Sequence, residues 1–439
     1  MRNGKRIGLA LSGGGYRAAA FHLGTLQKLD EMGLLKDVDV LSTISGGSIT
    51  GGAYCLYPGS YVAFHTYMVE QLRTKNVVKD VLLSWSFIRL ALFVLIMLGL
   101  AVYTLTIGWP WSLLVFVVLA LLIFLLLKFQ FDIFPASKEV EKAYNKFLFE
   151  GKTLKDFEEL KKEKVLPRIA IGSSNLQTGR PFTFSGDKMS DSAYAHYDPP
   201  VSFLHDQFPI ARAVMASSCV PFAFTPIPID KKYFRDPNDF DRINPQLVDG
   251  GVYDNQGIQK ITQEGSSYKC DVIITSDAGG PLSGEISFRN TIALLIRTVD
   301  VFMYRIKTMQ MVEQVYQNVI QKHRPIAYFS LGWRIQRLVP GFIDNMKKQL
   351  ILPEVLSAHG LKQEWIDAPE KYRQVIQQHL ESGIGYESVL AKDLTDDEWD
   401  LARHTGTNLT SLSPKRISCL IRHAANLTEL QVRLYCPGI

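Results

Sequence analysis

The chain begins with two apolar segments that each run into a turn of small residues and then into a helical pattern. The first apolar segment spans residues 7–11 and precedes a helix predicted over 18–32, and the second spans 38–44 and precedes a segment of helical character over 49–57. Strands that alternate with helices in this way are typical of a parallel sheet with helices on its faces. Such folds bind ligands at the carboxyl edge of the sheet, where both turns are expected to lie. We therefore predict an α/β fold with its functional site at these turns.

The second turn contains Ser45, within the sequence Ser-Thr-Ile-Ser-Gly-Gly-Ser of residues 42–48. A serine on a sharp strand-to-helix turn exposes its hydroxyl in the geometry of a nucleophile elbow. Gly46 and Gly47 fit this interpretation because a side chain there would collide with the returning backbone. The usual pattern has glycine two positions before the serine, and this chain has Thr43. The local sequence thus leaves a catalytic serine and an ordinary small-residue turn both open.

The first turn, Gly13-Gly14-Gly15, gathers backbone amides at the start of a helix, where negative charge is stabilised. A phosphate loop would need the pattern G-x-x-x-x-G-K-[ST] or G-x-G-x-x-G, and Tyr16 and Arg17 follow the glycines instead. An oxyanion hole needs only closely approaching amides, which a glycine run supplies. An oxyanion loop is therefore favoured over a nucleotide site, with a mobile glycine turn as the remaining alternative.

A serine nucleophile needs a base, and none of the nine histidines lies at an evident sheet-end loop with glycine or other catalytic-looking neighbours. His22 is expected to pack within the first helix, while His196 and His205 lie in a loop-rich segment without catalytic-looking neighbours. Asp249 follows an apolar run and precedes two glycines, but an ordinary Asp-Gly turn explains its local sequence better. Asp277, before Ala-Gly-Gly, has the same ambiguity.

Two long segments without a charge interrupt the α/β pattern, over residues 90–107 and 111–127. As helices they would be about 27 and 26 Å long, close to the roughly 30 Å of a hydrocarbon core. Arg89 precedes the first and Lys128 follows the second, so two crossings return both basic ends to the cytoplasmic side. We predict a hairpin of two transmembrane or deeply re-entrant helices, with the catalytic part of the chain in the cytoplasm. The alternative is a buried hairpin within a large soluble core.

Composition narrows the functional classes further. The net charge of +5 over 439 residues gives no nucleic-acid signal, and the 47% of hydrophobic residues is explained largely by the predicted hairpin. Five scattered cysteines without C-x-x-C spacing argue against a disulfide framework or a zinc site and favour a reducing compartment. The first six residues lack the apolar core of a signal peptide.

Three motifs in this order resemble those of the patatin-like phospholipase family. They are Gly13-Gly14-Gly15-Tyr16-Arg17, Ser45-Gly46-Gly47 and Asp249-Gly250-Gly251. Each follows an apolar run, and together they are far more specific than any one of them. The resemblance covers roughly residues 5–330, with the apolar hairpin as an insertion. Thr43, and Ser12 where aspartate is frequent, depart from the family pattern without removing a proposed catalytic group.

The resemblance implies a three-layer α/β/α sandwich with a mostly parallel central sheet. It also implies a serine–aspartate dyad that deacylates lipids without a metal or cofactor, which accounts for the missing histidine. The implied roles are nucleophile for Ser45, general base for Asp249, oxyanion amides for Gly13, Gly14 and Gly15, and support of that loop for Arg17.

These expectations combine into a membrane-associated lipid acyl hydrolase, similar to phospholipase A or lysophospholipase. Its expected partners are a phospholipid or other acyl-glycerol substrate and the bilayer, with no nucleic acid. An acyltransferase with the same dyad, or a catalytically silent scaffold or lipid-binding protein, remains open. The predicted organisation is a catalytic domain in two parts, 1–83 and 131–331, the hairpin at 84–130, and a mainly helical C-terminal extension at 332–439.

Overall fold

A computed structural model describes residues 4–280 and 290–439. Within them, nine strands form one sheet whose main path runs β5-β4-β3-β2-β1-β8-β9, with β7 pairing β3 and β6. The strands are β1 (Ile7–Leu11), β2 (Val38–Ile44), β3 (Arg168–Asn175), β4 (Arg180–Phe184), β5 (Met189–Asp191), β6 (Ile227–Pro228), β7 (Gln246–Asp249), β8 (Val272–Asp277) and β9 (Ile326–Ser330).

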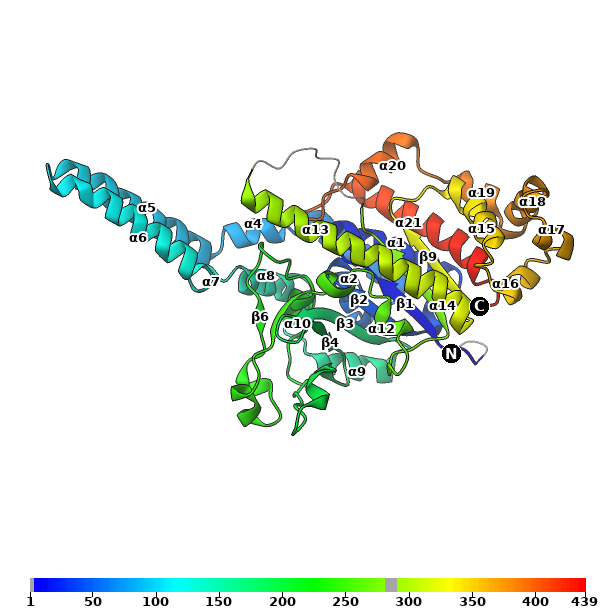
Figure 1. Ribbon diagram of the computed structural model, residues 1–439, viewed down its shortest axis with the longest axis horizontal. Coiled ribbons are helices and arrows are strands. Elements are labelled where there is room, and N and C mark those ends of the chain that lie inside the picture. Colours follow the sequence, from blue (N-terminus) through cyan, green and yellow to red (C-terminus); the bar gives the residue numbers. More distant parts are fainter. Residues whose placement is uncertain (1–3, 281–289) are drawn as a thin grey trace.

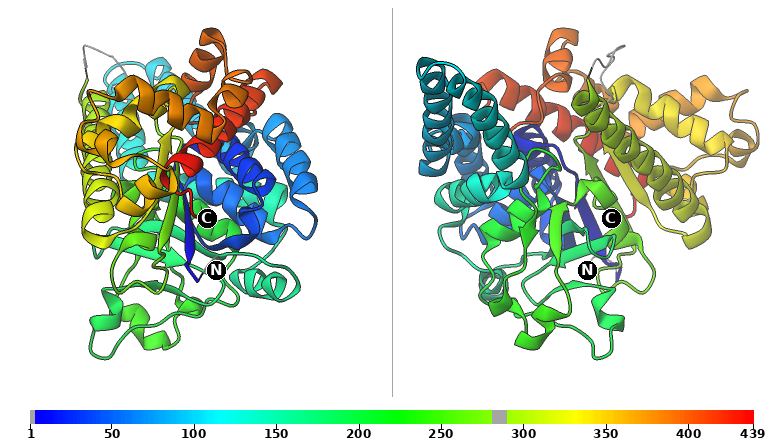
Figure 2. Two further views of the ribbon diagram at one scale, coloured as in Figure 1. Left: turned by 90° about the vertical axis from the view of Figure 1, so that its right-hand side faces the viewer. Right: turned by 60° about the vertical axis from the view of Figure 1, so that its left-hand side comes forward.

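The five strands β3, β2, β1, β8 and β9 run parallel, and the strands beyond β3 are antiparallel to their neighbours. The sequence of β1 is apolar throughout and every residue of it is buried, as expected for a parallel strand covered on both faces. Helices lie on both faces of the sheet (Figures 1 and 2). This arrangement confirms the predicted α/β class.

The helices that surround the sheet differ in their roles. Those that begin at the two predicted turns, α1 and α2, pack against each other, and α11 and α12 contact the sheet directly. Helices of the first half are α1 (Gly15–Glu31), α2 (Gly46–Leu56), α3 (Tyr61–Thr74), α4 (Val77–Leu82), α5 (Trp85–Thr106), α6 (Leu114–Lys128), α7 (Gln130–Ile133), α8 (Ala136–Tyr144), α9 (Leu154–Glu163) and α10 (Ile210–Ser217). Helices of the second half are α11 (Gly251–Asp254), α12 (Gln259–Thr262), α13 (Thr291–Gln310), α14 (Asn318–Lys322), α15 (Leu338–Lys347), α16 (Pro353–Ala358), α17 (Gln363–Asp367), α18 (Arg373–Ile384), α19 (Tyr386–Leu390), α20 (Asp396–Arg403) and α21 (Pro414–Tyr435).

The predicted hairpin is formed by α5 and α6, which pack against each other and project from the body of the molecule (Figure 1). The apolar window in residues 85–106 is only 11% buried and that in 111–128 only 6%, with mean hydropathies of 2.3 and 2.7. Length and composition allow each segment to cross a membrane. Their exposure argues against the alternative of a buried hairpin in a soluble core.

The last helix, α21, packs along α1 and against β9, so the C-terminal region shares the main hydrophobic core. The contact with α1 is close because a Cβ atom at Gly24 would lie 2.1 Å from the carbonyl oxygen of Ile421. The helix begins as its sequence predicts: the Ser413 side chain caps it and Pro414 occupies its first turn. Residues 1–3 and 281–289 of the predicted catalytic parts lie outside the described residues.

Candidate active site

Ser45 occupies a sharp turn between β2 and α2. Its φ of 50° and ψ of −115° lie in a region that residues with a side chain rarely adopt. Small neighbours make the turn possible, since a Cβ atom at Gly46 would lie 2.2 Å from the Gly15 carbonyl and one at Gly47 would lie 2.3 Å from the Leu11 carbonyl. The strained backbone and these close approaches are those of a nucleophile elbow.

Asp249 reaches Ser45 through the register of the sheet. Ile44 of β2 pairs with Gly172 of β3, and the next residue of β3, Ser173, pairs with Asp249 at the end of β7. The Ser45 side chain lies beside the Asp249 carboxylate and stabilises its ionised form. The two residues, separated by about two hundred positions in the sequence, therefore meet at the carboxyl edge of the parallel strands.

Both members of the pair are enclosed, with exposed fractions of 6% for Ser45 and 4% for Asp249. Burial raises the pKa of Asp249 to about 6, although the hydrogen bond from the Gly251 amide and the neighbouring Ser45 side chain oppose the rise. The Gly251 amide donates to Asp249 Oδ1 over 2.7 Å. At neutral pH the carboxylate is thus ionised, but it is more basic than an exposed aspartate and better able to accept a proton.

The glycine turn faces the serine. A Cβ atom at Gly13 would lie 3.2 Å from Ser45 Cβ. The Gly13 amide, however, donates to the Asn255 carbonyl over 2.9 Å, so in this conformation it does not serve as an oxyanion donor. Gly14 and Gly15 have φ of 138° and 57°, which a residue with a side chain would adopt only with strain. Among the described residues, no backbone carbonyl accepts a hydrogen bond from the amide of Gly14 or Gly15. These two amides therefore fit the predicted oxyanion role better.

Arg17 is buried under this turn, as its predicted supporting role requires. Its Nη2 lies 3.4 Å from the position of a Cβ atom at Gly14, and its Nη1 donates to the Thr405 carbonyl over 3.2 Å. Burial lowers the pKa of Arg17 to about 10, and the negative charge of Asp277 partly opposes this. The guanidinium therefore stays charged and joins the glycine turn to the C-terminal region.

The C-terminal region contacts the glycine turn at further points that the sequence did not indicate. The Tyr16 amide donates to the Asn408 carbonyl over 3.1 Å. A Cβ atom at Gly15 would lie 2.5 Å from the Thr407 carbonyl oxygen. Residues 405–408, which we call the bracing segment, thus fix one side of the turn.

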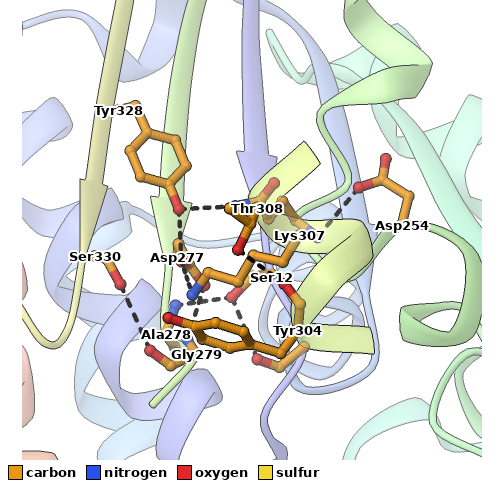
Figure 3. A network of polar contacts seen from close by, with 12 residues as sticks. Ser12, Asp254, Asp277, Ala278, Gly279, Tyr304, Lys307, Thr308, Tyr328 and Ser330 are labelled. Carbon is orange, nitrogen blue, oxygen red and sulfur yellow. Dashed lines mark hydrogen bonds and ion pairs between the residues drawn. The ribbon is translucent and has the colours of Figure 1, made fainter. Parts of the chain in front are cut away.

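Asp277, the second aspartate with turn context, belongs to a buried network beside the site (Figure 3). Its carboxylate pairs with Lys307 Nζ at 2.6 Å and accepts a hydrogen bond from the Tyr328 hydroxyl over 2.7 Å. Burial raises its pKa, but the Lys307 ammonium and these hydrogen bonds leave it below the ordinary value. Ser12 joins the same network by accepting from the Ala278 amide over 2.7 Å. The network anchors α13 to β8 and leaves Asp277 fully engaged.

His22 packs within the fold, as its sequence context predicts. His22 is fully buried, with one ring nitrogen 2.9 Å from Ser276 Oγ and the other 2.9 Å from the Ser12 carbonyl. Burial lowers its pKa to about 4, so the ring is neutral. His205 pairs with the neighbouring Asp206. Within residues 4–280 and 290–439, no group of three His, Cys, Asp or Glu side chains is arranged to hold a metal ion.

Two polar residues that lie beside the site were not predicted from the sequence as site residues. Ser217 Oγ accepts from the Ser45 amide over 2.9 Å and donates to the Gly172 carbonyl over 2.6 Å. The side-chain oxygen of Asn255 would lie 2.3 Å from a Cβ atom at Gly13 and 2.6 Å from one at Gly251. Only the folded structure brings these groups beside the elbow.

Comparison with protein families matches residues 9–259 to the patatin-like phospholipase family. The match spans more than half of the chain, and the chain therefore belongs to this family. The matched residues include all three motifs that carry the resemblance. No curated protein sequence matches the chain.

Solved structures to which the chain is similar include human GIVD cytosolic phospholipase A2, at 16% identity and a TM-score of 0.39, covering 62% of this chain and 43% of that one. The complex of the same human enzyme with methyl γ-linolenyl fluorophosphonate has 16% identity and a TM-score of 0.46, covering 97% of this chain and 57% of that one. VipD from Legionella pneumophila has 13% identity and a TM-score of 0.31, covering 91% of this chain and 82% of that one. This chain spans less than half of the first of these chains, and its family assignment rests on the sequence match alone.

Proposed function

We propose that this protein is a membrane-associated lipid acyl hydrolase that works through the Ser45–Asp249 dyad. The observation that carries the proposal is the position of the Ser45 side chain beside the buried Asp249 carboxylate, at a strained elbow that faces the glycine turn. Membership of the patatin-like phospholipase family supports a lipid ester as the substrate.

In the proposed reaction, Asp249 takes the hydroxyl proton of Ser45 while the serine oxygen attacks the ester carbonyl. The amides of Gly14 and Gly15 stabilise the oxyanion of the tetrahedral intermediate. The leaving alcohol takes the proton from Asp249, and an acyl-enzyme remains on Ser45. A water molecule, activated by the same carboxylate, then releases the fatty acid.

The hairpin supports a site of action at a bilayer. Its apolar side chains are exposed over nearly the whole of both helices. Insertion of this surface into a hydrocarbon core would stabilise it, at roughly 25 cal/mol for each Å² of apolar surface removed from water. Two crossings would keep the catalytic body on one side, next to the lipid that serves as substrate.

The proposal is tested with the purified full chain in detergent. A fluorophosphonate probe is expected to label the wild-type protein and not the Ser45→Ala variant, since only the activated serine attacks phosphorus. Incubation with a mixed lipid extract should release fatty acids, detected by mass spectrometry, and Ser45→Ala should release none above background. Equal labelling of both proteins would contradict the assignment of the nucleophile. Labelling without fatty-acid release would redirect the proposal to another acyl ester.

A further inference from the structure

The loop between α10 and β6 presents two apolar side chains to solvent next to the dyad. In this loop, residues 218–225, Val220 is 46% exposed and Phe222 is 64% exposed. Phe222 has a φ of 68°, in the left-handed region that bulky residues avoid. Burial of the ring does not offset this strain, because the ring is the more exposed of the two side chains. Strain of this kind is concentrated at functional positions.

One end of the loop is attached to the catalytic dyad. The amide of Asp249 donates to the Cys219 carbonyl over 2.8 Å, and the amide of Gly250 donates to the Ser217 carbonyl over 3.1 Å. The Ser217 hydroxyl also accepts a hydrogen bond from the Ser45 amide. The position of the loop is therefore fixed relative to both the nucleophile and the base.

The other end of the loop is attached to the base of the hairpin. Thr225 accepts hydrogen bonds at its carbonyl from the Ser137 hydroxyl and, over 3.1 Å, from the Cys219 thiol. Ser137 lies in the first turn of α8, the helix that follows the hairpin. Figure 1 shows α8 where the hairpin joins the body of the molecule, close to α10 and β6, which the loop connects.

The surroundings of this junction fit a lipid surface. Apolar side chains are exposed on the two segments that enter and leave the hairpin, namely Leu82, Leu83, Trp85, Phe129 and Phe131. Basic residues flank the same segments, namely Lys79, Arg89, Lys128, Lys138 and Lys142. Aromatic and cationic side chains together are typical of the interface between hydrocarbon and headgroups, and the cations favour anionic lipids.

We propose that residues 218–225 form an interfacial loop that inserts Val220 and Phe222 into the surface of an anionic bilayer beside the hairpin. The occupant of this apolar patch is thus the membrane, because Ser137 joins the loop to the segment that leaves the hairpin, where Phe129 and Phe131 are also exposed. Insertion would hold the mouth of the dyad against the lipid layer and shorten the path of an acyl ester to Ser45. This inference rests on the proposed function, since it assumes that the hairpin lies in a bilayer.

The first test compares two substrates for the full chain reconstituted in phosphatidylcholine–phosphatidylglycerol vesicles. The double variant Val220→Ser/Phe222→Ser is expected to hydrolyse vesicle lipid at least about fivefold more slowly, because it loses apolar contact with the bilayer. Its hydrolysis of a short-chain, water-soluble ester should match the wild-type rate. The matched control is Val165→Ser, which also replaces an exposed apolar residue by serine. Val165 is 73% exposed and lies just before β3, at the edge of the sheet opposite to the dyad.

The two substrates separate the possible failures. Equal loss on both substrates would assign the loop to the dyad itself, and no loss on either would leave it without a role at the membrane, so both results would overturn the inference. If the wild-type protein hydrolyses neither substrate, the proposed function fails, and insertion of the loop is then decided by a measurement that needs no turnover.

That measurement places an environment-sensitive dye on the loop. All five native cysteines are buried, so the thiol introduced by Phe222→Cys can be labelled selectively. In reconstituted vesicles we expect a blue-shifted emission that nitroxide-labelled lipids quench, whereas dye at Val165→Cys should remain in water. Absence of quenching at position 222 would overturn the inference. A blue shift that depends on protein concentration and resists lipid quenching would assign the loop to a second copy of the chain and would also overturn it.

Discussion

Asp249 combines burial with its proposed role as a base, and this combination would make the proposed activity sensitive to pH. Its pKa of about 6 means that protonation removes the base as the pH falls through this value. At pH 5 only about a tenth of the protein would keep an ionised carboxylate, so we expect kcat/KM for a soluble ester to fall about tenfold from its neutral plateau. The measurement is a pH–rate profile.

A second buried carboxylate provides the control for this profile. Burial also raises the pKa of Asp254 to about 6, but Asp254 accepts the amides of Gln256, Gly257 and Gln259 and does not contact Ser45. Asp254→Asn should therefore keep the acid limb in place. Disappearance of the acid limb in that variant would show that Asp254, and not Asp249, governs the pH dependence.

The buried charge of Asp249 also has a cost in stability. Its pKa in the folded state is raised from 3.8 to about 6, so the ionised form destabilises the fold at neutral pH. Asp249→Asn should lower ester turnover by roughly 10²–10⁴ while raising the free energy of unfolding at pH 8 by about 3 kcal/mol. The sign follows because folding takes up protons between the two pKa values, so wild-type stability declines as the pH rises through this range.

Thermal unfolding of both proteins at several pH values tests this prediction. The difference in Tm between variant and wild type should be largest at pH 8, should shrink as the pH falls through about 6, and should approach zero below about pH 3, where Asp249 is protonated in both states. A variant that is less stable than wild type at pH 8 would show that the carboxylate makes a net favourable contribution to the fold.

At the scale of single elements, the glycine turn depends on contacts far away in the sequence. Gly15 combines a φ of 57° with the Thr407 carbonyl 2.5 Å from the position of its Cβ, so an added methyl group meets backbone that cannot easily move. We expect Gly15→Ala to displace the bracing segment, to abolish ester hydrolysis and to reduce the free energy of unfolding by at least about 2 kcal/mol. Urea unfolding and ester assays measure the two effects.

Gly33 is the matched control for this substitution. It also has a positive φ, of 70°, but no atom lies within 4 Å of the position of its Cβ. Gly33→Ala should therefore lose about 1–2 kcal/mol from the left-handed backbone alone and keep its activity. Equal loss of activity in both variants would mean that the contact with Thr407 is unimportant.

The same elements show what the sequence could predict. Gly13, Ser45 and Asp249 carry local signals, because each lies in a small-residue turn after an apolar run, and the alternation of strands and helices places those turns at one edge. Asn255, Ser217 and the bracing segment carry no such signal. Their positions beside the elbow depend on the pairing of β7 with β3 and the packing of α21 on α1, which are long-range contacts without a local pattern.

At the scale of the whole molecule, the hairpin and the catalytic body are joined through a narrow base. Helices α4 and α8, which flank the hairpin, pack against each other, and Lys146 just after α8 pairs with Asp80 of α4 at 3.3 Å. A short linker between them could therefore close the chain after removal of residues 84–135. The dyad and its surroundings draw on none of the removed residues, so the body is expected to fold without them.

Excision of the hairpin thus tests whether the hairpin holds the protein at the membrane without taking part in ester hydrolysis. With residues 84–135 replaced by a flexible glycine–serine linker, we expect hydrolysis of a soluble ester within about threefold of wild type and at least tenfold slower hydrolysis of vesicle lipid, because the substrate must then be reached from solution. The excised protein should also stay in the supernatant when vesicles are sedimented, whereas the full chain sediments with them. Residual binding that Val220→Ser/Phe222→Ser removes would be attributed to the interfacial loop, so the two membrane contacts can be measured separately. Loss of soluble-ester activity in a folded excision variant would instead place part of the catalytic machinery in the hairpin, contrary to the geometry of the dyad.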